Sequence, residues 1–206
     1  MTSRGALCPV PACVSHRRPR APEHGRQTSG GGDSLPAICD VVLWHSLEMD
    51  PVYRRDAFPA DVRLERDGLR LRPWTFGDLS CIEEASRDPE VPNGTTVPRS
   101  FSERAGNEFI ERQWVRATSG EGLILAIVDS AIDAAVGLSV LVHRQQPGVV
   151  GLGYWVVASR RREGFATRVV SLLSRWALTL PAVGPLAALV EPGNCASDRV
   201  LEWAHL

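Results

Sequence analysis

The sequence lacks any hydrophobic run long enough to cross a membrane. A membrane span needs roughly 18 to 20 apolar residues, and the apolar stretch from Leu35 to Leu47 is short and interrupted by Asp40 and His45. The N-terminus has Arg4 but no apolar core behind it, as a secretory signal would require. We therefore expect no membrane partner and a cytoplasmic location.

The sequence also lacks a cysteine pattern and a surplus of charge. Its five cysteines include no Cys-x-x-Cys pair, and Cys8, Cys13, His16 and His24 are spaced irregularly, unlike the ligands of a zinc site. Neither a metal nor a disulfide is expected. The net charge of −1 gives no overall attraction to nucleic acid, so no nucleic-acid partner is expected.

The first 48 residues differ in composition from the rest of the chain. They contain several prolines and arginines and the run Gly30-Gly31-Gly32, and such polar, turn-rich sequence buries too little apolar surface to offset the entropy of ordering. Residues 1–48 are therefore expected to be a disordered N-terminal extension. Met49 is an alternative start to Met1.

The most informative stretch runs from Gly151 to Leu180. Residues 149–157 are β-branched, aromatic and apolar, which favours a buried strand. From Phe165 on, apolar residues recur at spacings of three and four, which predicts an amphipathic helix that ends at Pro181. Between the two lie three arginines and Gly164. A strand, a basic loop and a helix N-terminus together predict an anion cradle for a phosphate or diphosphate.

Two common phosphate loops do not fit this stretch. A nucleoside triphosphatase loop needs Gly-x-x-x-x-Gly-Lys-Ser/Thr, and no such lysine is present. A dinucleotide fold needs Gly-x-Gly-x-x-Gly at the turn, but Gly151 and Gly153 lie within the expected strand, with Val156 in place of the third glycine.

The segment Arg161 to Ala166 matches the Gln/Arg-x-x-Gly-x-Gly/Ala signature of the GCN5-related N-acetyltransferases, the GNAT family. Over residues 62–206 the chain resembles the branch that acetylates ribosomal-protein N-termini. The segments that carry this resemblance, in order, are Leu69 to Trp74, Asp78-Leu79, Gly153 to Val156, Gly164 to Thr167, Trp176-Ala177 and Glu191 to Ser197.

The resemblance implies an α/β (α+β) fold: a mixed, mostly antiparallel central sheet flanked by helices. In that fold the fourth and fifth strands splay apart and the pantetheine arm of acetyl-CoA, the cosubstrate, lies between them. The expected domain, 62–206, stops before the family's last two strands, so it is expected to be incomplete at the C-terminus. The fifth strand, 186–190, would then have an unpaired edge, which a homodimer is one way to cover.

The resemblance also assigns residues to the cosubstrate, with only the backbone of the strand residues assigned to the pantetheine. Ser197 is expected near the thioester, and the catalytic base is left unassigned because relatives often carry a glutamate where this chain has Gly151. Two further departures are Arg162, where many relatives have glycine, and Glu163, where a basic residue is common. The expected cofactor-binding residues are Tyr154, Trp155, Val156, Arg161, Arg162, Glu163, Gly164, Phe165, Ala166, Thr167, Asn194 and Ser197.

The remaining elements follow from periodicity and caps. A strand is expected at 69–73, a helix from Thr75 or Asp78 to Ser86, and a second helix over 102–117 with Ser102 as N-cap. Strands are expected at 123–128 and 135–143.

Two functions remain open at this point. The first is an acetyl-CoA-dependent N-acetyltransferase that acts on a protein N-terminus or a small-molecule amine by direct attack in a ternary complex. The second is a degenerate, non-catalytic module that binds coenzyme A or a partner. Glu108, Glu111 and His143 are candidate proton acceptors, each with an ordinary surface or strand-end role as the alternative, and Cys195 is not proposed as a nucleophile.

Overall fold

A computed structural model describes residues 58–59, 61–144, 149–188, 190 and 194–204. The expected N-terminal extension, the choice between Met1 and Met49, and residues 191–193 of the resemblance lie outside the described residues. None of the described helices is both long and apolar enough to cross a membrane.

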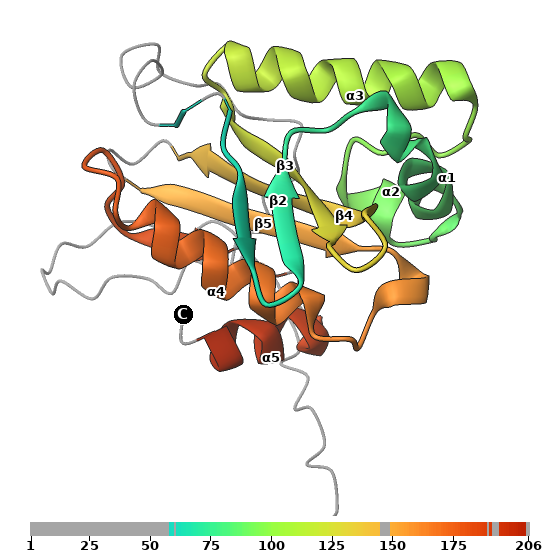
Figure 1. Ribbon diagram of the computed structural model, residues 1–206. Helices are drawn as coiled ribbons and strands as arrows, with labels where there is room; N and C mark the ends of the chain where they lie inside the picture. The colour runs from blue at the N-terminus through green and yellow to red at the C-terminus, as the bar shows by residue number, and fades with distance from the viewer. Residues whose placement is uncertain (1–57, 60, 145–148, 189, 191–193, 205–206) are drawn as a thin grey trace, which may run out of the picture.

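Six strands form a single sheet in chain order (Figure 1). Every neighbouring pair is antiparallel except the last, which is parallel. The strands are β1 (Leu64–Arg66), β2 (Leu69–Arg72), β3 (Gly122–Asp129), β4 (Ala134–His143), β5 (Val150–Val156) and β6 (Leu186–Ala188). The mixed, mostly antiparallel sheet expected from the sequence is confirmed.

The helices flank this sheet. Their bounds are α1 (Leu79–Arg87), α2 (Val91–Gly94), α3 (Glu103–Thr118), α4 (Phe165–Ala177) and α5 (Cys195–Ala204), with short 3₁₀ turns η2 (Phe76–Asp78) and η3 (Ala158–Arg160). On one face of the sheet, α3 packs on β3 and α1 packs on β4. On the other face, α4 packs on β5 and β2, and α5 packs on α4 (Figure 1).

The first strand was not predicted from the sequence. β1 pairs with β2 through a two-residue turn at Asp67 and Gly68, whose φ angles are 52° and 74°. Asp-Gly is a favoured pair for this turn because both central residues need positive φ. The signal was therefore present in the sequence, but β1 has only three residues and two of them are exposed, so no hydrophobic alternation accompanies it.

Most other expected elements are confirmed. All eight residues of β3 are buried, as befits a central strand. Ser102 caps α3, its hydroxyl accepting the N–H of Ala105 at 3.1 Å. Two ends differ: α4 stops at Ala177 rather than near Leu180, because a separate turn covers 178–180, and β6 has three residues where five were expected.

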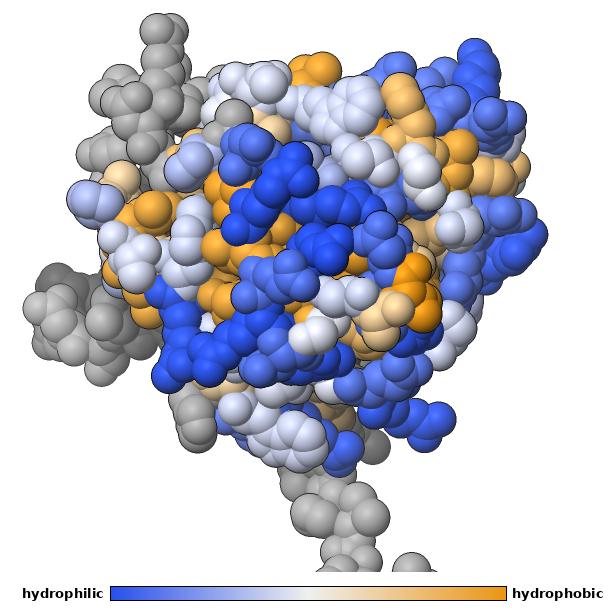
Figure 2. All heavy atoms as spheres, in the orientation of Figure 1, coloured by the Kyte–Doolittle hydropathy of each residue, from blue (hydrophilic) through white to orange (hydrophobic). Residues whose placement is uncertain are grey.

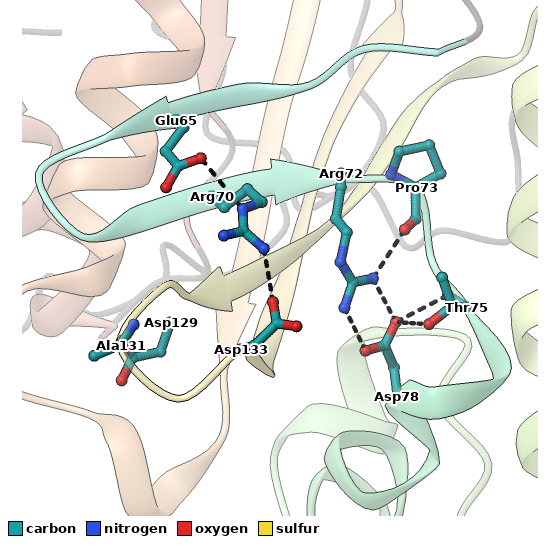
Figure 3. Close-up of polar contacts among 9 residues, drawn as sticks. All are labelled: Glu65, Arg70, Arg72, Pro73, Thr75, Asp78, Asp129, Ala131 and Asp133. Carbon is teal, nitrogen blue, oxygen red and sulfur yellow. Dashed lines mark hydrogen bonds and ion pairs between the residues drawn. The ribbon is translucent and has the colours of Figure 1, made fainter.

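A largely buried ion pair joins β2 to the start of α1 (Figure 3). Both oxygens of Asp78 accept from the guanidinium of Arg72 at 2.8 Å, and the Asp78 side chain is only 4% exposed. On the same face of β2, Arg70 contacts the exposed carboxylates of Glu65 and Asp133. Strongly hydrophilic side chains gather on this face of the molecule, with hydrophobic surface between them (Figure 2).

Candidate cofactor site

The chain turns sharply between β5 and α4. Gly164 is the N-cap of α4 and has φ 79° and ψ 5°, and Arg162 has φ 64°. Left-handed dihedrals cost about 1–2 kcal/mol for a residue with a Cβ, so a glycine is the natural residue at position 164. This turn aims the N-terminus of α4 outward, with residues 161–164 exposed.

The backbone donors of this turn are open. No described residue accepts a hydrogen bond from the N–H groups of residues 162–167, and the first bonded amide is that of Arg168, which donates to the Gly164 carbonyl at 3.1 Å. A Cβ built on Gly164 would meet nothing within 4 Å. The helix dipole adds positive potential at the same end. The arrangement fits a diphosphate, as the sequence predicts.

Two of the three loop arginines are already paired with carboxylates. Arg160 bonds Asp129 at 2.5 Å and Glu163 at 3.0 Å. Arg161 donates to the Asp88 carboxylate at 2.6 Å and to the Val156 carbonyl at 3.0 Å. The Arg161 side chain therefore links the turn between β5 and α4 to Asp88 at the end of α1. Arg161 is not the free phosphate ligand that the sequence suggested.

Two other arginines near the turn between β5 and α4 are not paired with carboxylates of the described residues and supply positive charge there. Arg162 is exposed and has no ion pair with a described residue. Arg168 donates only to backbone carbonyls, those of Asp67, Glu163 and Gly164. Arg168 was not among the predicted site residues because its helical spacing placed it on the solvent side. Its position four residues after Gly164, within reach of the loop, was the available signal.

The remaining loop residues divide into packing and backbone roles. Phe165 is 4% exposed, and the guanidinium groups of Arg160 and Arg168 lie over its ring, 5.3 and 4.5 Å from the ring centre. Its side chain belongs to the core, so only its N–H can serve an anion. Ala166 and Thr167 are half-buried in the first helical turn, and the Glu163 carboxylate is held by Arg160.

Among the described residues, the parallel pairing of β5 to β6 extends from Val150 to Leu152 and leaves the following residues of that β5 edge unpaired. The Val157 N–H donates to the Val136 carbonyl, and the Arg144 N–H donates to the Val149 carbonyl. The backbone N–H and carbonyl groups of the odd-numbered β5 residues therefore point toward β4, and those of the even-numbered residues point toward β6. The backbone groups of Tyr154 and Val156 therefore point away from β4, in agreement with the expected splay, and the Val156 carbonyl accepts from the Arg161 side chain there.

The backbone of Trp155 does not fit its predicted role. Its N–H and carbonyl face Leu138 of β4, and its side chain packs against Trp74, with ring centres 6.2 Å apart. Trp155 is thus a core residue of the face that carries α3. Strand pairing decides which edge a backbone serves, and the sequence did not reveal that register.

The N-terminus of α5 contains two predicted residues, of which Ser197 lies next to Tyr154. Asn194 caps the helix, its side-chain oxygen accepting the Ser197 N–H at 3.1 Å. The Tyr154 hydroxyl is buried without a hydrogen bond of normal geometry among the described residues. Burial raises the pKa of Tyr154, the neighbouring Ser197 hydroxyl opposes that rise, and the Asp198 charge adds to it. The phenol therefore keeps its proton at neutral pH.

The other acid-base candidates lie in ordinary settings. Glu108 and Glu111 are exposed on α3, and Glu108 contacts Arg104 at 3.6 Å. His143 ends β4 and stacks on Phe58, and burial lowers the pKa of His143. Within the described part of the chain, no group of His, Cys, Asp and Glu residues is arranged to hold a metal.

We expect the contribution of the Asp88–Arg161 ion pair to the free energy of unfolding to fall in acid. The Asp88 side chain is 3% exposed. Its burial would raise the pKa, but the N–H groups of Glu90 and Val91 and the Arg161 charge outweigh it, so the net pKa of Asp88 is lowered. A lowered folded-state pKa gives stability that is present above the unfolded value of about 3.9 and is lost as pH falls through the folded value.

Urea unfolding of wild type and Asp88→Asn between pH 7 and pH 2 measures this effect. The difference in unfolding free energy should be largest near pH 7 and should shrink below about pH 4, where the unfolded carboxylate protonates. Asp61→Asn, at a carboxylate 73% exposed, is the control and should stay close to wild type. A gap for Asp88→Asn that does not change with pH would contradict the assignment.

Comparison with known proteins agrees with this geometry. A family model described as the acetyltransferase (GNAT) domain matches residues 68–206. Among curated proteins no sequence matches the chain significantly. A solved ribosomal-protein-serine acetyltransferase from Vibrio cholerae superposes with a TM-score of 0.61 at 16% identity, covering 71% of this chain and 84% of that one.

Two other solved structures carry coenzyme A compounds. RimJ from Mycobacterium smegmatis, in complex with CoA-disulfide, has a TM-score of 0.55 at 22% identity and covers 65% of this chain and 68% of its own. The microcin C7 self-immunity acetyltransferase MccE, in complex with acetyl-CoA and AMP, has a TM-score of 0.56 at 14% identity, covering 68% and 78%. At these identities the superpositions establish the shared fold.

The family match spans about two thirds of the chain, and it contains both the open α4 N-terminus and the β5 edge. The protein belongs to the GNAT family of acetyltransferases. It is an N-acetyltransferase, and acetyl-CoA is the cosubstrate of this family.

Proposed function

We propose that the chain transfers the acetyl group of acetyl-CoA to a primary amine, either a protein N-terminus or a small-molecule amine, by direct attack in a ternary complex. The observation that carries this proposal is the set of unbonded N–H groups at residues 162–167, beside the uncovered Gly164. They would hold the diphosphate, with the charges of Arg162 and Arg168 nearby. The backbone groups of Tyr154 and the Val156 N–H would hold the pantetheine arm by strand-like hydrogen bonds, since the Val156 carbonyl already accepts from Arg161.

Direct attack fits the chemistry of the described residues. A covalent route needs a reactive nucleophile. Burial raises the pKa of the Cys81 thiol in the core, which makes Cys81 inert, and we do not propose the half-buried Cys195 as a nucleophile. In direct transfer the unprotonated amine forms the C–N bond, the C–S bond breaks, the amine proton leaves to water and the departing thiolate takes a proton. Holding both reactants in place supplies much of the rate gain.

Tyr154 is the best-placed proton donor for the thiolate. Its hydroxyl is buried beside Ser197 under the N-terminus of α5 and stays protonated at neutral pH. In this proposal Ser197 lies near the thioester, as the resemblance implies. General acid catalysis typically contributes 10²–10⁴-fold.

We expect Tyr154→Phe to lower kcat by at least about 10²-fold while leaving the dissociation constant of acetyl-CoA within about twofold. The ring is conserved in that change, so packing is kept and only the proton donor is lost. Thiol release from acetyl-CoA with a panel of primary amines measures kcat, and calorimetry measures binding. Ser139→Ala on the paired strand position is the control for loss of a buried hydroxyl.

An unchanged kcat in Tyr154→Phe would remove Tyr154 from the chemistry. Binding of acetyl-CoA without release of the coenzyme A thiol in the presence of any amine would instead favour a binding module over an enzyme.

A further inference from the structure

The Arg144 guanidinium is partly buried and has no carboxylate partner among the described residues. Arg144 follows β4 and donates its backbone N–H to the Val149 carbonyl at 3.0 Å. Its side chain folds back over the next strand, so that a Cβ built on Gly151 would lie 2.8 Å from its Cζ and Nη2 atoms. The Arg144 guanidinium therefore rests on the bare backbone of Gly151.

This guanidinium has no partner among the described residues, neither an ion pair nor a hydrogen bond from its side chain. Burial lowers the pKa of Arg144. Arg160 and Arg161, in contrast, are each paired with a carboxylate. A guanidinium has five donors, and withdrawing them from water without acceptors is unfavourable. An oxyanion that approaches Arg144 would relieve that penalty.

The position of Arg144 relates it to the proposed reaction. Side chains alternate along a strand, so Gly151, Gly153 and Trp155 share one face of β5, and Tyr154 belongs to the opposite face, where Ser197 lies. The two glycines place no side chain on the first face. α4 packs on β5 from the face of Tyr154, whereas on the other face α3 and α1 pack on β3 and β4, so we take the face of Gly151 and Gly153 as the one from which an acceptor approaches β5.

We propose that Arg144 binds an oxyanion on the acceptor, so that the substrate is an amine that also carries a carboxylate or a phosphate. This inference rests on the proposed function and deepens it by naming the substrate class. A guanidinium fork matches two oxygens of one oxyanion, which gives both affinity and orientation. Arg144 is thus a specificity-determining residue, with its effect on substrate binding rather than on the reacting atoms.

The strand gives a length for this substrate. Gly151 and Tyr154 are three residues apart, which is roughly 10 Å at about 3.3 Å per residue. With the reacting amine at the open edge near Gly153 or Tyr154, the oxyanion on Arg144 lies roughly 7–10 Å from it. An amine and oxyanion separated by five or six carbon atoms meet this spacing, whereas glycine is too short.

The test uses matched amines and acetyl-CoA with the full chain. For wild type, kcat/KM for 6-aminohexanoate should exceed that for 6-aminohexanamide by about tenfold to a hundredfold, mainly through KM, because one charge-assisted bidentate contact is gained. The preference should vanish in Arg144→Gln and be reduced in Arg144→Lys, which keeps the charge but not the fork. Arg144→Glu should favour 1,6-diaminohexane. An aminoalkyl phosphate of equal length shows which oxyanion is preferred.

Two binding measurements separate this inference from the proposed function. Calorimetry should give the same acetyl-CoA affinity for wild type and Arg144→Gln; no binding in either would refute the proposed function itself. In the presence of coenzyme A, the product 6-acetamidohexanoate should bind wild type about tenfold more tightly than Arg144→Gln. Normal acetyl-CoA binding combined with equal product affinity in the two proteins, or with an acid-to-amide preference that survives Arg144→Gln, would overturn the role of Arg144.

Discussion

Gly164→Phe is expected to weaken acetyl-CoA binding by at least about 100-fold. The Cβ position of Gly164 faces open space, beside the N–H groups proposed to hold the diphosphate, and a phenyl ring there would occupy the room that the anion needs. Losing two charge-assisted hydrogen bonds of about 1.5–3 kcal/mol each corresponds to at least that factor. Isothermal titration calorimetry with acetyl-CoA measures the change.

Gly164→Ala is the matched control for this result. Both substitutions force a Cβ into the left-handed conformation at φ 79°, at the same cost of about 1–2 kcal/mol, but the methyl group meets nothing within 4 Å. The alanine variant should therefore bind within about tenfold of wild type. Equal affinities in the phenylalanine and alanine variants would mean that the diphosphate does not approach this position.

Arg72→Ala is expected to lower the free energy of unfolding by about 3–5 kcal/mol. It removes both 2.8 Å contacts to Asp78, a carboxylate that is only 4% exposed, and leaves that charge buried without a counterion (Figure 3). The Thr75 N–H and hydroxyl would be its remaining donors. Urea unfolding followed by far-UV circular dichroism gives the value.

The same strand supplies the control. Arg70 lies two residues before Arg72 and also bridges two carboxylates, but Glu65 and Asp133 are 58% and 75% exposed. Exposed ion pairs contribute at most about 1 kcal/mol, so Arg70→Ala should stay within that range. The double variant Arg72→Ala/Asp78→Ala should be less destabilised than Arg72→Ala, because the orphaned charge is gone. A loss of similar size in the two single variants would show that burial does not set the strength of the Arg72 pair.

Local patterns predicted what depends on neighbours in sequence. The spacing of apolar residues fixed the helix after Phe165, the polar residue Ser102 marked the start of α3, and the order of motifs indicated the family. The loop glycine at position 164 was expected to be exposed at a helix N-terminus, and it is.

Long-range pairing was beyond those patterns. Arg161 was predicted to bind phosphate because the sequence around it contains no partner for it. Its partner Asp88 lies 73 residues away in sequence, at the end of α1. The direction of the Trp155 backbone depends on which strand lies on each side of β5. The desolvation of Arg144 arises from a side chain lying on a glycine of the paired strand, and a sequence shows neither the pairing nor the burial.

We propose that the backbone at the start of α4 binds the diphosphate of coenzyme A. The most direct test of this role is calorimetric titration of the wild-type protein with coenzyme A and, separately, with pantetheine, which has the same arm but lacks the diphosphate and the nucleotide. We expect coenzyme A to bind at least about 100-fold more tightly, since several charge-assisted bonds are absent from pantetheine. Equal affinity for the two compounds, or no heat with coenzyme A, would contradict the account.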